Sequence, residues 1–128
     1  MERKVIQTQN APAPIGPYNQ AISYGGILYV SGQIAINPDT GALETQDIQT
    51  ETHRVMKNLN AVLDAGGSGF KRVLKTTIFL SDMNNYAAVN EVYGLYFDDA
   101  TAPAREAVQV SVLPKNVNVE ISAIAAVK

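Results

Sequence analysis

Several kinds of chemistry are excluded because the residue types that they need are rare or missing in this chain. None of its 128 residues is a cysteine, which removes disulfides, thiolate metal sites and thiol nucleophiles. It has one histidine, His53, so we expect neither a histidine metal site nor a Ser/His/Asp triad. His53 lies off the apolar stripe of its predicted helix, and we interpret it as a solvent-facing residue. Any reaction must therefore use other side chains.

The chain also lacks an excess of positive charge. Its formal net charge is −2, only 17% of its residues are charged, and no run of lysine or arginine offers a phosphate-binding patch. No apolar stretch approaches the roughly 20 residues of a membrane span, and the first residues have no apolar core of signal-peptide length. We therefore expect a cytoplasmic protein that binds neither nucleic acid nor membranes.

The length suits a single domain, residues 1–128, with one core. The hydrophobic content of 46% is high for so small a protein. This favours burial of some apolar surface by association with further copies of the chain.

The periodicity of apolar residues predicts an α+β fold. Helical spacing predicts one helix from its N-cap, Asp47, to a stop at Gly66-Gly67, and a second helix over residues 84–97. Alternation and turn signals predict strands near the N-terminus and at 21–24, 27–33, 73–80, 107–113 and 117–127, with Gly25-Gly26 turning a hairpin. This order predicts a two-layer sandwich, in which two helices cover one face of a mixed sheet.

Side-chain alternation assigns residues to the faces of these elements. We expect Leu74 to share the buried face of its strand with Ile78 and Leu80. Asn90 falls at the centre of the apolar stripe of the second helix, where an unpaired polar group would cost about 1–3 kcal/mol. The uncovered face of the sheet is expected to be partly apolar and to pack against copies of the chain. Its predicted members are Ala107, Ser111, Ile124 and Ala126.

Arg105 is a candidate binding residue. It follows Ala102-Pro103-Ala104 at the beginning of a predicted strand, where the proline restricts the direction of the chain. Arginine grips a planar carboxylate through two parallel hydrogen bonds. The alternative is an ion pair with Asp98, Asp99 or Glu106.

Glu120 is a candidate general base. It lies in mid-strand between Val119 and Ile121 and is predicted to point away from the main apolar face, in a position where acidic residues are disfavoured. A carboxylate there needs a partner or a task. The alternatives are a salt bridge to Lys75 or Arg105, and a half-buried group that holds a water molecule and accepts its proton.

Two further segments are candidates for a binding site. Gly32, between Ser31 and Gln33, permits close approach to the backbone, although an edge strand or a β-bulge is the alternative. Three prolines within residues 10–20 stiffen an extended arm that presents Tyr18.

Taken together, several segments resemble the reactive-intermediate deaminase family (Rid, formerly YjgF-type), and in particular its imine-deaminase branch. They span nearly the whole chain in family order. These segments are residues 16–21, 30–34, 76–83, 89–94, 103–105, 113–115 and 119–121.

The resemblance implies a homotrimer of chorismate-mutase-like subunits, with ligand clefts between neighbouring chains and no cofactor or metal. It implies that Arg105 binds the substrate carboxylate and that Glu120 orients the hydrolytic water, the two converging on one pocket from adjoining strands. Residues expected to help line the cleft are Tyr18, Ser31, Gly32, Asn90 and Ala107, the last in place of a cysteine common in the family.

The activity implied by the resemblance is that of a 2-iminobutanoate/2-iminopropanoate deaminase. Such an enzyme hydrolyses the 2-imino acids released by pyridoxal-phosphate-dependent dehydratases to 2-keto acids and ammonia. Two departures from the family pattern are Glu106, which could compete for Arg105, and Ser122, which replaces an acidic residue. A trimer that binds small carboxylates without turnover is the alternative, and an RNA-cleaving role is disfavoured by the acidic balance.

Overall fold

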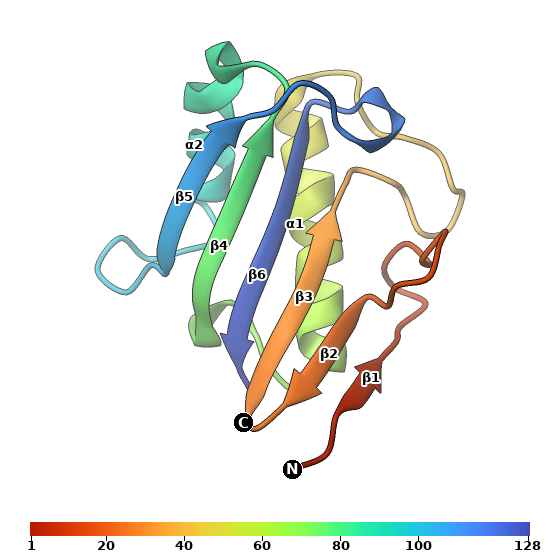
Figure 1. The fold of residues 1–128 in the computed structure, drawn as a ribbon. Coiled ribbons are helices and arrows are strands. Elements are labelled where there is room, and N and C mark those ends of the chain that lie inside the picture. Colours follow the sequence, from red (N-terminus) through yellow and green to blue (C-terminus); the bar gives the residue numbers. More distant parts are fainter.

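The computed structural model describes all residues 1–128 and shows one mixed six-stranded sheet with two helices on one face (Figure 1). This confirms the predicted α+β class. The strand order is β1-β2-β3-β6-β4-β5. The strands are β1 (Lys4–Ile6), β2 (Ala21–Tyr24), β3 (Ile27–Gln33), β4 (Val73–Leu80), β5 (Ala104–Gln109) and β6 (Val119–Ala126). The helices are α1 (Ile48–Ala65) and α2 (Tyr86–Tyr93), with short 3₁₀ turns η1 (Phe70–Arg72), η2 (Met83–Asn85) and η3 (Pro114–Asn116).

Strand β4 separates the two strands that carry the main candidate residues. It pairs in parallel with β5 and antiparallel with β6. Thr76 of β4 lies opposite Arg105, and Phe79 of β4 lies opposite Glu120. Because side chains alternate along a strand, these pairings place Arg105 and Glu120 on different faces of the sheet.

Helix α1 begins and ends at the predicted residues. The Asp47 side chain accepts a hydrogen bond from the Thr50 backbone N–H at 2.7 Å, as an N-cap does. At the other end, a Cβ on Gly66 would lie only 2.6 Å from Leu28 Cδ2. The glycine thus stops the helix and lets its end pack closely on β3.

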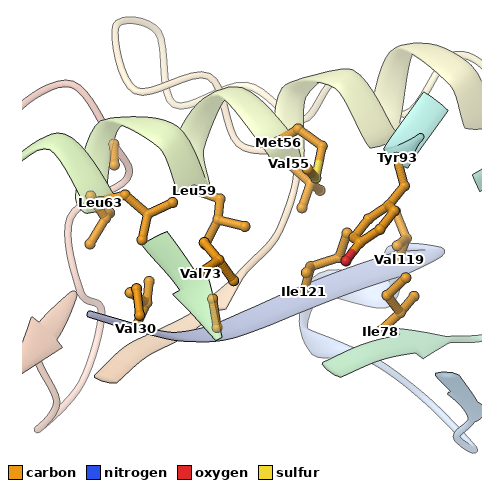
Figure 2. Close-up of a cluster of buried hydrophobic side chains, with 14 of the residues drawn as sticks. Val30, Val55, Met56, Leu59, Leu63, Val73, Ile78, Tyr93, Val119 and Ile121 are labelled. Carbon is orange, nitrogen blue, oxygen red and sulfur yellow. The ribbon is translucent and has the colours of Figure 1, made fainter. Parts of the chain in front are cut away.

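The core lies between α1 and the sheet (Figure 2). Fully buried aliphatic side chains of the helix point onto the strands, and Tyr93 of α2 adds an aromatic ring beside Ile78 (Figure 2). Removing such side chains from water supplies about 1.5–3 kcal/mol each and stabilises the two-layer arrangement. The fully buried aliphatic residues of α1 are Val55, Met56, Leu59, Val62 and Leu63.

The predicted hairpin is confirmed. Gly25 and Gly26 have φ values of +61° and +81°, a pair of left-handed residues that suits a tight turn between twisted strands. Strands β2 and β3 pair antiparallel on either side of it.

The second helix is shorter than predicted. It ends at Tyr93 instead of residue 97, because the next aromatic residues turn inward. Phe97 packs 4.7 Å from the Tyr93 ring, and Tyr96 packs 5.5 Å from the Phe70 ring, centroid to centroid. Asn90 is exposed at the rim of the helix, so its predicted place at the centre of the buried stripe is wrong.

Three further differences concern the strands. The pairing of β4 with β6 is irregular between Val73 and Lys75, which turns Leu74 outward, 49% exposed, so its predicted burial is wrong. Strand β5 spans 104–109 instead of 107–113 because its parallel pairing with β4 ends at Leu80. Ala107 lies opposite Ile78 on the helix-covered face, which corrects its assignment to the uncovered face. Ile124 pairs with Lys75 and lies on the uncovered face, as expected. Neither helix is both long enough and apolar enough to cross a bilayer.

Candidate functional site

Arg105 is held by side chains of α2. Its Nη1 donates to Asn90 Oδ1 at 2.7 Å, and its Nη2 donates to the Tyr86 hydroxyl at 2.6 Å. The Arg105 Cζ lies 5.6 Å from the centroid of the Tyr86 ring and 5.0 Å from that of Tyr93, close enough for cation–π attraction. Of the five N–H donors of a guanidinium, three are left for another acceptor.

The charge of Arg105 is not balanced by an acidic residue. The ion pairs of the chain are Arg54–Glu44 and Lys75–Glu106, so the alternative interpretation of Arg105 as an ion-pair partner is wrong. An open cavity of about 330 Å³ adjoins the guanidinium. This arrangement suits the binding of a small ligand that carries a carboxylate group. The cavity is lined by Asn90, Tyr93, Gly94, Phe97, Asp99, Ala102, Pro103 and Arg105.

Glu106 does not compete for the guanidinium. Its carboxylate bonds to the Thr77 hydroxyl and lies 3.2 Å from Lys75 Nζ, on the face opposite Arg105. The hydrogen bond from Thr77 and the nearby Lys75 lower the pKa of Glu106. Side-chain alternation along β5 thus directs Arg105 and Glu106 to opposite faces of the sheet, so the competition considered from the sequence does not occur.

The buried Tyr93 packs against the Arg105 guanidinium and is itself held by Thr76. The Tyr93 hydroxyl lies 2.7 Å from Thr76 Oγ1, and burial raises the pKa of Tyr93 despite the opposing effects of Thr76 and Arg105. The ring therefore stays neutral and offers its face to the arginine.

Glu120 occupies a separate, smaller cavity on the open face of the sheet. The cavity measures about 80 Å³, and Glu120 makes none of the chain's ion pairs, so the predicted alternatives with Lys75 and Arg105 are wrong. Burial raises the pKa of Glu120, as expected when a carboxylate is partly removed from water. Other residues of this cavity are Pro12, Ala13, Ile15, Tyr18, Gln20, Gly32, Gln33, Ile34, Ile36 and Pro114.

Gly32 gives Glu120 its place. The pairing of β3 with β6 shifts between Val30 and Gln33, so the alternative interpretation of this segment as a bulge is confirmed. A Cβ on Gly32 would lie 2.7 Å from Glu120 Cδ. Only a residue without a side chain lets the carboxylate lie over the backbone of β3.

The N-terminal arm forms one wall of the Glu120 cavity. The buried Gln20 amide donates to the carbonyl oxygens of Thr8, Ala11 and Pro12 at 2.9–3.2 Å, and its Oε1 accepts from Thr8 N at 2.7 Å. This tether fixes the arm that presents Tyr18, whose exposed ring lines the cavity. The Ser31 hydroxyl donates to the Asn19 carbonyl at 2.6 Å and helps to anchor the arm on β3.

The predicted convergence of Arg105 and Glu120 on one pocket from adjoining strands is wrong for a single chain. Strand β4 lies between their strands, the side chains leave opposite faces of the sheet, and the two cavities share no residue. Arg105 bonds to Asn90, and Ala107 lies two residues further along the same face of β5. Glu120 lines a cavity together with Tyr18 and Gly32. The predicted site residues thus fall into two groups, one on each face of the sheet.

Sequence reasoning did not identify Tyr86 as a site residue, although its position four residues before Asn90 puts both on one helical face. His53 is half-buried, with Nδ1 2.7 Å from the Tyr96 hydroxyl, so its interpretation as a solvent-facing residue is wrong. No three His, Asp or Glu side chains lie close enough together to hold a metal ion.

Comparison with known proteins identifies the family. The family model described as Endoribonuclease L-PSP matches residues 8–127. A mouse protein named 2-iminobutanoate/2-iminopropanoate deaminase is 46% identical over 123 residues, which are 96% of this chain and 90% of the mouse protein.

Two solved structures have the same fold. A protein of the conserved Rid family from Yersinia pestis is 52% identical, with a TM-score of 0.95 over 98% of this chain and 100% of that chain. The TdcF protein of E. coli, solved with bound serine, is 41% identical, with a TM-score of 0.91 over 98% of this chain and 99% of that chain. The chain is thus a member of the Endoribonuclease L-PSP family, and it is similar over nearly its whole length to a Rid protein and to a relative named as an imine deaminase.

Proposed function

We propose that the protein hydrolyses 2-imino acids to 2-keto acids and ammonia at sites formed between neighbouring copies of the chain. Arg105 of one copy binds the substrate carboxylate, and Glu120 of the next activates water. The observation that carries the proposal is the division of the chemistry into two half-sites. An unpaired guanidinium with free donors lies on one face of the sheet, and a half-buried carboxylate beside a small cavity lies on the other. Neither half is sufficient alone.

The open face of the sheet supports association between copies. Tyr29 and Val108 are 49% and 42% exposed on this face, and the half-buried Ile124 and Phe79 lie between them in the sheet. An apolar face of this kind is normally covered. In the proposed closed homotrimer, one repeated contact brings the edge strand β5 of each copy, which carries Arg105, to the open sheet face of the next copy, which carries Glu120.

The residues have separate tasks in the reaction. The substrate carboxylate accepts from the free N–H groups of Arg105, which Asn90 and Tyr86 hold in place. Glu120 orients a water molecule and accepts its proton as the water oxygen attacks the carbon of the protonated imine. The C=N electron pair moves to nitrogen and gives a neutral carbinolamine.

The second half of the reaction returns Glu120 to its starting state. Protonated Glu120 gives its proton to the amine nitrogen, the C–N bond breaks, and the hydroxyl oxygen forms the keto group as its proton leaves with ammonia. Every tenfold acceleration needs only about 1.4 kcal/mol of transition-state stabilisation. Orientation of substrate and water with one base can supply several such factors.

The substrate has a chemical source outside this protein. Dehydratases that use pyridoxal phosphate release enamines, which tautomerise to 2-imino acids. The proposal needs no cofactor on this chain, and it keeps the expectation of a cytoplasmic protein that acts on small molecules.

The direct test measures keto-acid release from 2-iminobutanoate generated in situ by a dehydratase. We expect Arg105→Ala and Glu120→Gln each to lose most of the acceleration, and Arg72→Ala, an exposed arginine on η1, to keep it. A wild-type protein without acceleration, or two folded variants as fast as wild type, would show that the proposal is wrong.

A mixing experiment tests the division of the site between copies. After subunit exchange, oligomers of Arg105→Ala and Glu120→Gln contain some interfaces with both functional groups. Random association of equal amounts should restore about a quarter of wild-type activity. No recovery in verified mixed oligomers contradicts a shared site.

A second function is favoured by one comparison. The relative TdcF was solved with bound serine. A bound amino acid also fits a protein that binds small carboxylates without turnover. That function predicts binding of 2-oxobutanoate that depends on Arg105, together with no effect of Glu120→Gln on the rate of imine hydrolysis. The family description names an endoribonuclease, but the net charge of −2 does not favour RNA binding.

A further inference from the structure

The buried side of α1 contains polar residues that packing alone does not require. Three buried positions of this helix are polar: Glu51, Thr52 and Asn58. The Thr52 hydroxyl donates back to the Ile48 carbonyl at 2.7 Å within the helix. Glu51 and Asn58 are fully buried and, seven residues apart, lie on the same side of α1 two turns from each other.

Glu51 receives three hydrogen bonds from the beginning of β6. Its Oε2 accepts from the backbone N–H groups of Asn118 and Val119 at 2.7 and 3.1 Å, and its Oε1 accepts from Asn118 Nδ2 at 2.8 Å. Neither of the two ion pairs of the chain includes it. Burial of a carboxylate without a basic partner is unfavourable unless its hydrogen bonds are good. An apolar residue would fill the same space, so the contacts of Glu51 need another explanation.

Asn58, which like Glu51 is fully buried, contacts a segment that lines the Glu120 cavity. Its Nδ2 donates to the carbonyl oxygens of Ile34 and Ile36 at 3.0 and 2.9 Å, and both isoleucines line the Glu120 cavity. The residues that Glu51 binds, Asn118 and Val119, directly precede Glu120. The two polar side chains of α1 therefore hold two segments next to Glu120: residues 34–36, which include lining residues of its cavity, and residues 118–119, which precede it in the chain.

We propose that Glu51 is a positioning residue for Glu120. By fixing the N–H groups of Asn118 and Val119, it sets the start of β6 and with it the placement of the Glu120 carboxylate over Gly32. Asn118 is held from a second direction, since its carbonyl accepts from Ser81 N at 3.1 Å. The kinetic part of this inference rests on the proposed imine hydrolysis, whereas its structural part does not.

Glu51→Gln is the most informative variant. It keeps the shape of the side chain but replaces one acceptor oxygen by an NH₂ group, which then faces N–H donors. We expect kcat for imine hydrolysis to fall by at least about tenfold, the effect of a displaced base, with KM changed by less than about twofold. KM should hold because Arg105 lies on the other face of the sheet.

A reversed pair provides a rescue. In Glu51→Gln/Asn118→Asp the glutamine NH₂ can donate to the aspartate, which restores the side-chain bond with its polarity exchanged. We expect the double variant to recover a large part of kcat. Asn118→Ala, which leaves both backbone bonds to Glu51 in place, should lower kcat by only about two- to fivefold and serves as the second variant if Glu51→Gln does not fold.

Ser68→Ala is the matched control for stability. Ser68 is buried, and its hydroxyl donates to the Ala126 carbonyl at 2.7 Å at the opposite end of β6. The variant should lower Tm without a change in kcat. A Glu51→Gln protein that folds with the kcat of wild type overturns the proposal, and so does an equal loss of kcat in Ser68→Ala.

A crystal structure of Glu51→Gln separates this proposal from the proposed function. We expect the Glu120 carboxylate to leave its place over Gly32, and faster hydrogen exchange at the Asn118 and Val119 amides. If wild type fails to accelerate imine hydrolysis, the proposed function fails, and this structural result alone decides on the positioning role. Glu120 unmoved in the variant, with both amides still protected, shows that Glu51 does not position it.

Discussion

The Glu120 carboxylate lies over Gly32 so closely that no side chain fits between them. A methyl group at position 32 would approach Glu120 Cδ to 2.7 Å, with Cγ at 3.0 Å, inside normal van der Waals contact. The carboxylate end of a glutamate can rotate away from such a clash, whereas the backbone of β3 cannot move without disturbing its pairing with β6. The position of the Glu120 carboxylate, the proposed base, therefore depends on the absence of a side chain at Gly32.

Gly32→Ala should displace Glu120 and leave the fold intact. We expect kcat for imine hydrolysis to fall by about 10- to 100-fold, with a loss of stability of less than about 1.5 kcal/mol because the carboxylate can yield. Steady-state kinetics and urea unfolding measure the two effects. A matched Gly69→Ala variant, at a glycine whose added Cβ meets no atom within 4 Å, should show no loss of kcat. Equal losses in the two variants would contradict the role of Gly32.

The pH dependence of the reaction should reflect the environment of Glu120. Burial raises the pKa of this carboxyl, and a general base acts in its ionised form. Activity should therefore fall on the acid side at a pH above the ordinary range of glutamic acid, and this limb should be absent from Glu120→Gln. A pH profile of kcat/KM checks it. A limb at the ordinary pKa of an exposed glutamate, or one retained in the variant, contradicts the prediction.

The same raised pKa has a consequence for stability. The folded protein binds the Glu120 proton more tightly than the unfolded chain does, so the contribution of this group to stability is fully present below the unfolded pKa. It is lost as the pH rises through the folded pKa. Relative to wild type, Glu120→Gln should gain stability at neutral pH and lose that advantage in acid. Urea unfolding at several pH values measures the difference, and a pH-independent difference contradicts it.

The hydroxyl of Tyr86 should matter for substrate binding. Tyr86→Phe keeps the ring beside Arg105 and removes the oxygen that accepts from Nη2. A lost hydrogen bond to a charged group is worth about 1.5–3 kcal/mol, so we expect KM to rise about tenfold or more with little change in kcat. Tyr24→Phe, an exposed residue of β2, is the matched control. A fall in kcat at constant KM would instead assign the hydroxyl to the chemical step.

The buried pair of Tyr93 and Thr76 should show coupling in stability. Tyr93→Phe leaves the Thr76 hydroxyl buried without its partner at 2.7 Å, at a cost of about 1–3 kcal/mol. Adding Thr76→Val removes the unpaired group and should recover part of this loss. A double-mutant cycle from urea unfolding measures the coupling. Strict additivity of the two single changes would show that the bond contributes nothing.

Association of copies through the open face can be tested at Val108. A charge introduced there by Val108→Asp should weaken self-association, because the residue lies on the apolar side of the sheet that faces away from both helices. Sedimentation velocity should show smaller species than for wild type. Asn60→Asp, on the exposed side of α1, adds the same charge elsewhere and should leave the oligomer unchanged. An unchanged oligomer in Val108→Asp places the contact on another surface.

Local signals in the sequence predicted the elements well where they act over a few residues. Asp47 predicted the beginning of α1, Gly66-Gly67 its end, and Gly25-Gly26 the hairpin turn. The predicted end of α2 was wrong. An apolar residue at position 97 suits a longer helix, but it suits equally well the observed packing of the Phe97 ring on Tyr93.

Which residues of different strands share a face of the sheet depends on how the strands pair, and this pairing cannot be derived from the sequence pattern. Alternation relates Arg105 to Ala107 and Glu120 to Ser122 within each strand, but it does not relate one strand to the other. The register of β4 does, through Thr76 and Phe79. The irregular pairing near Val73 likewise turned Leu74 outward. The residues of the candidate site were thus foreseeable, and their division between two faces was not.

The central place of β6 has a consequence for biosynthesis. This strand leaves the ribosome after all the others, yet it joins β3 to β4, so the two halves of the sheet cannot pair with each other before residues 119–126 have been made. Until then both halves expose unpaired strand edges, which are prone to aggregation. Nascent chains stalled before residue 119 should therefore depend on chaperones far more than the released protein does.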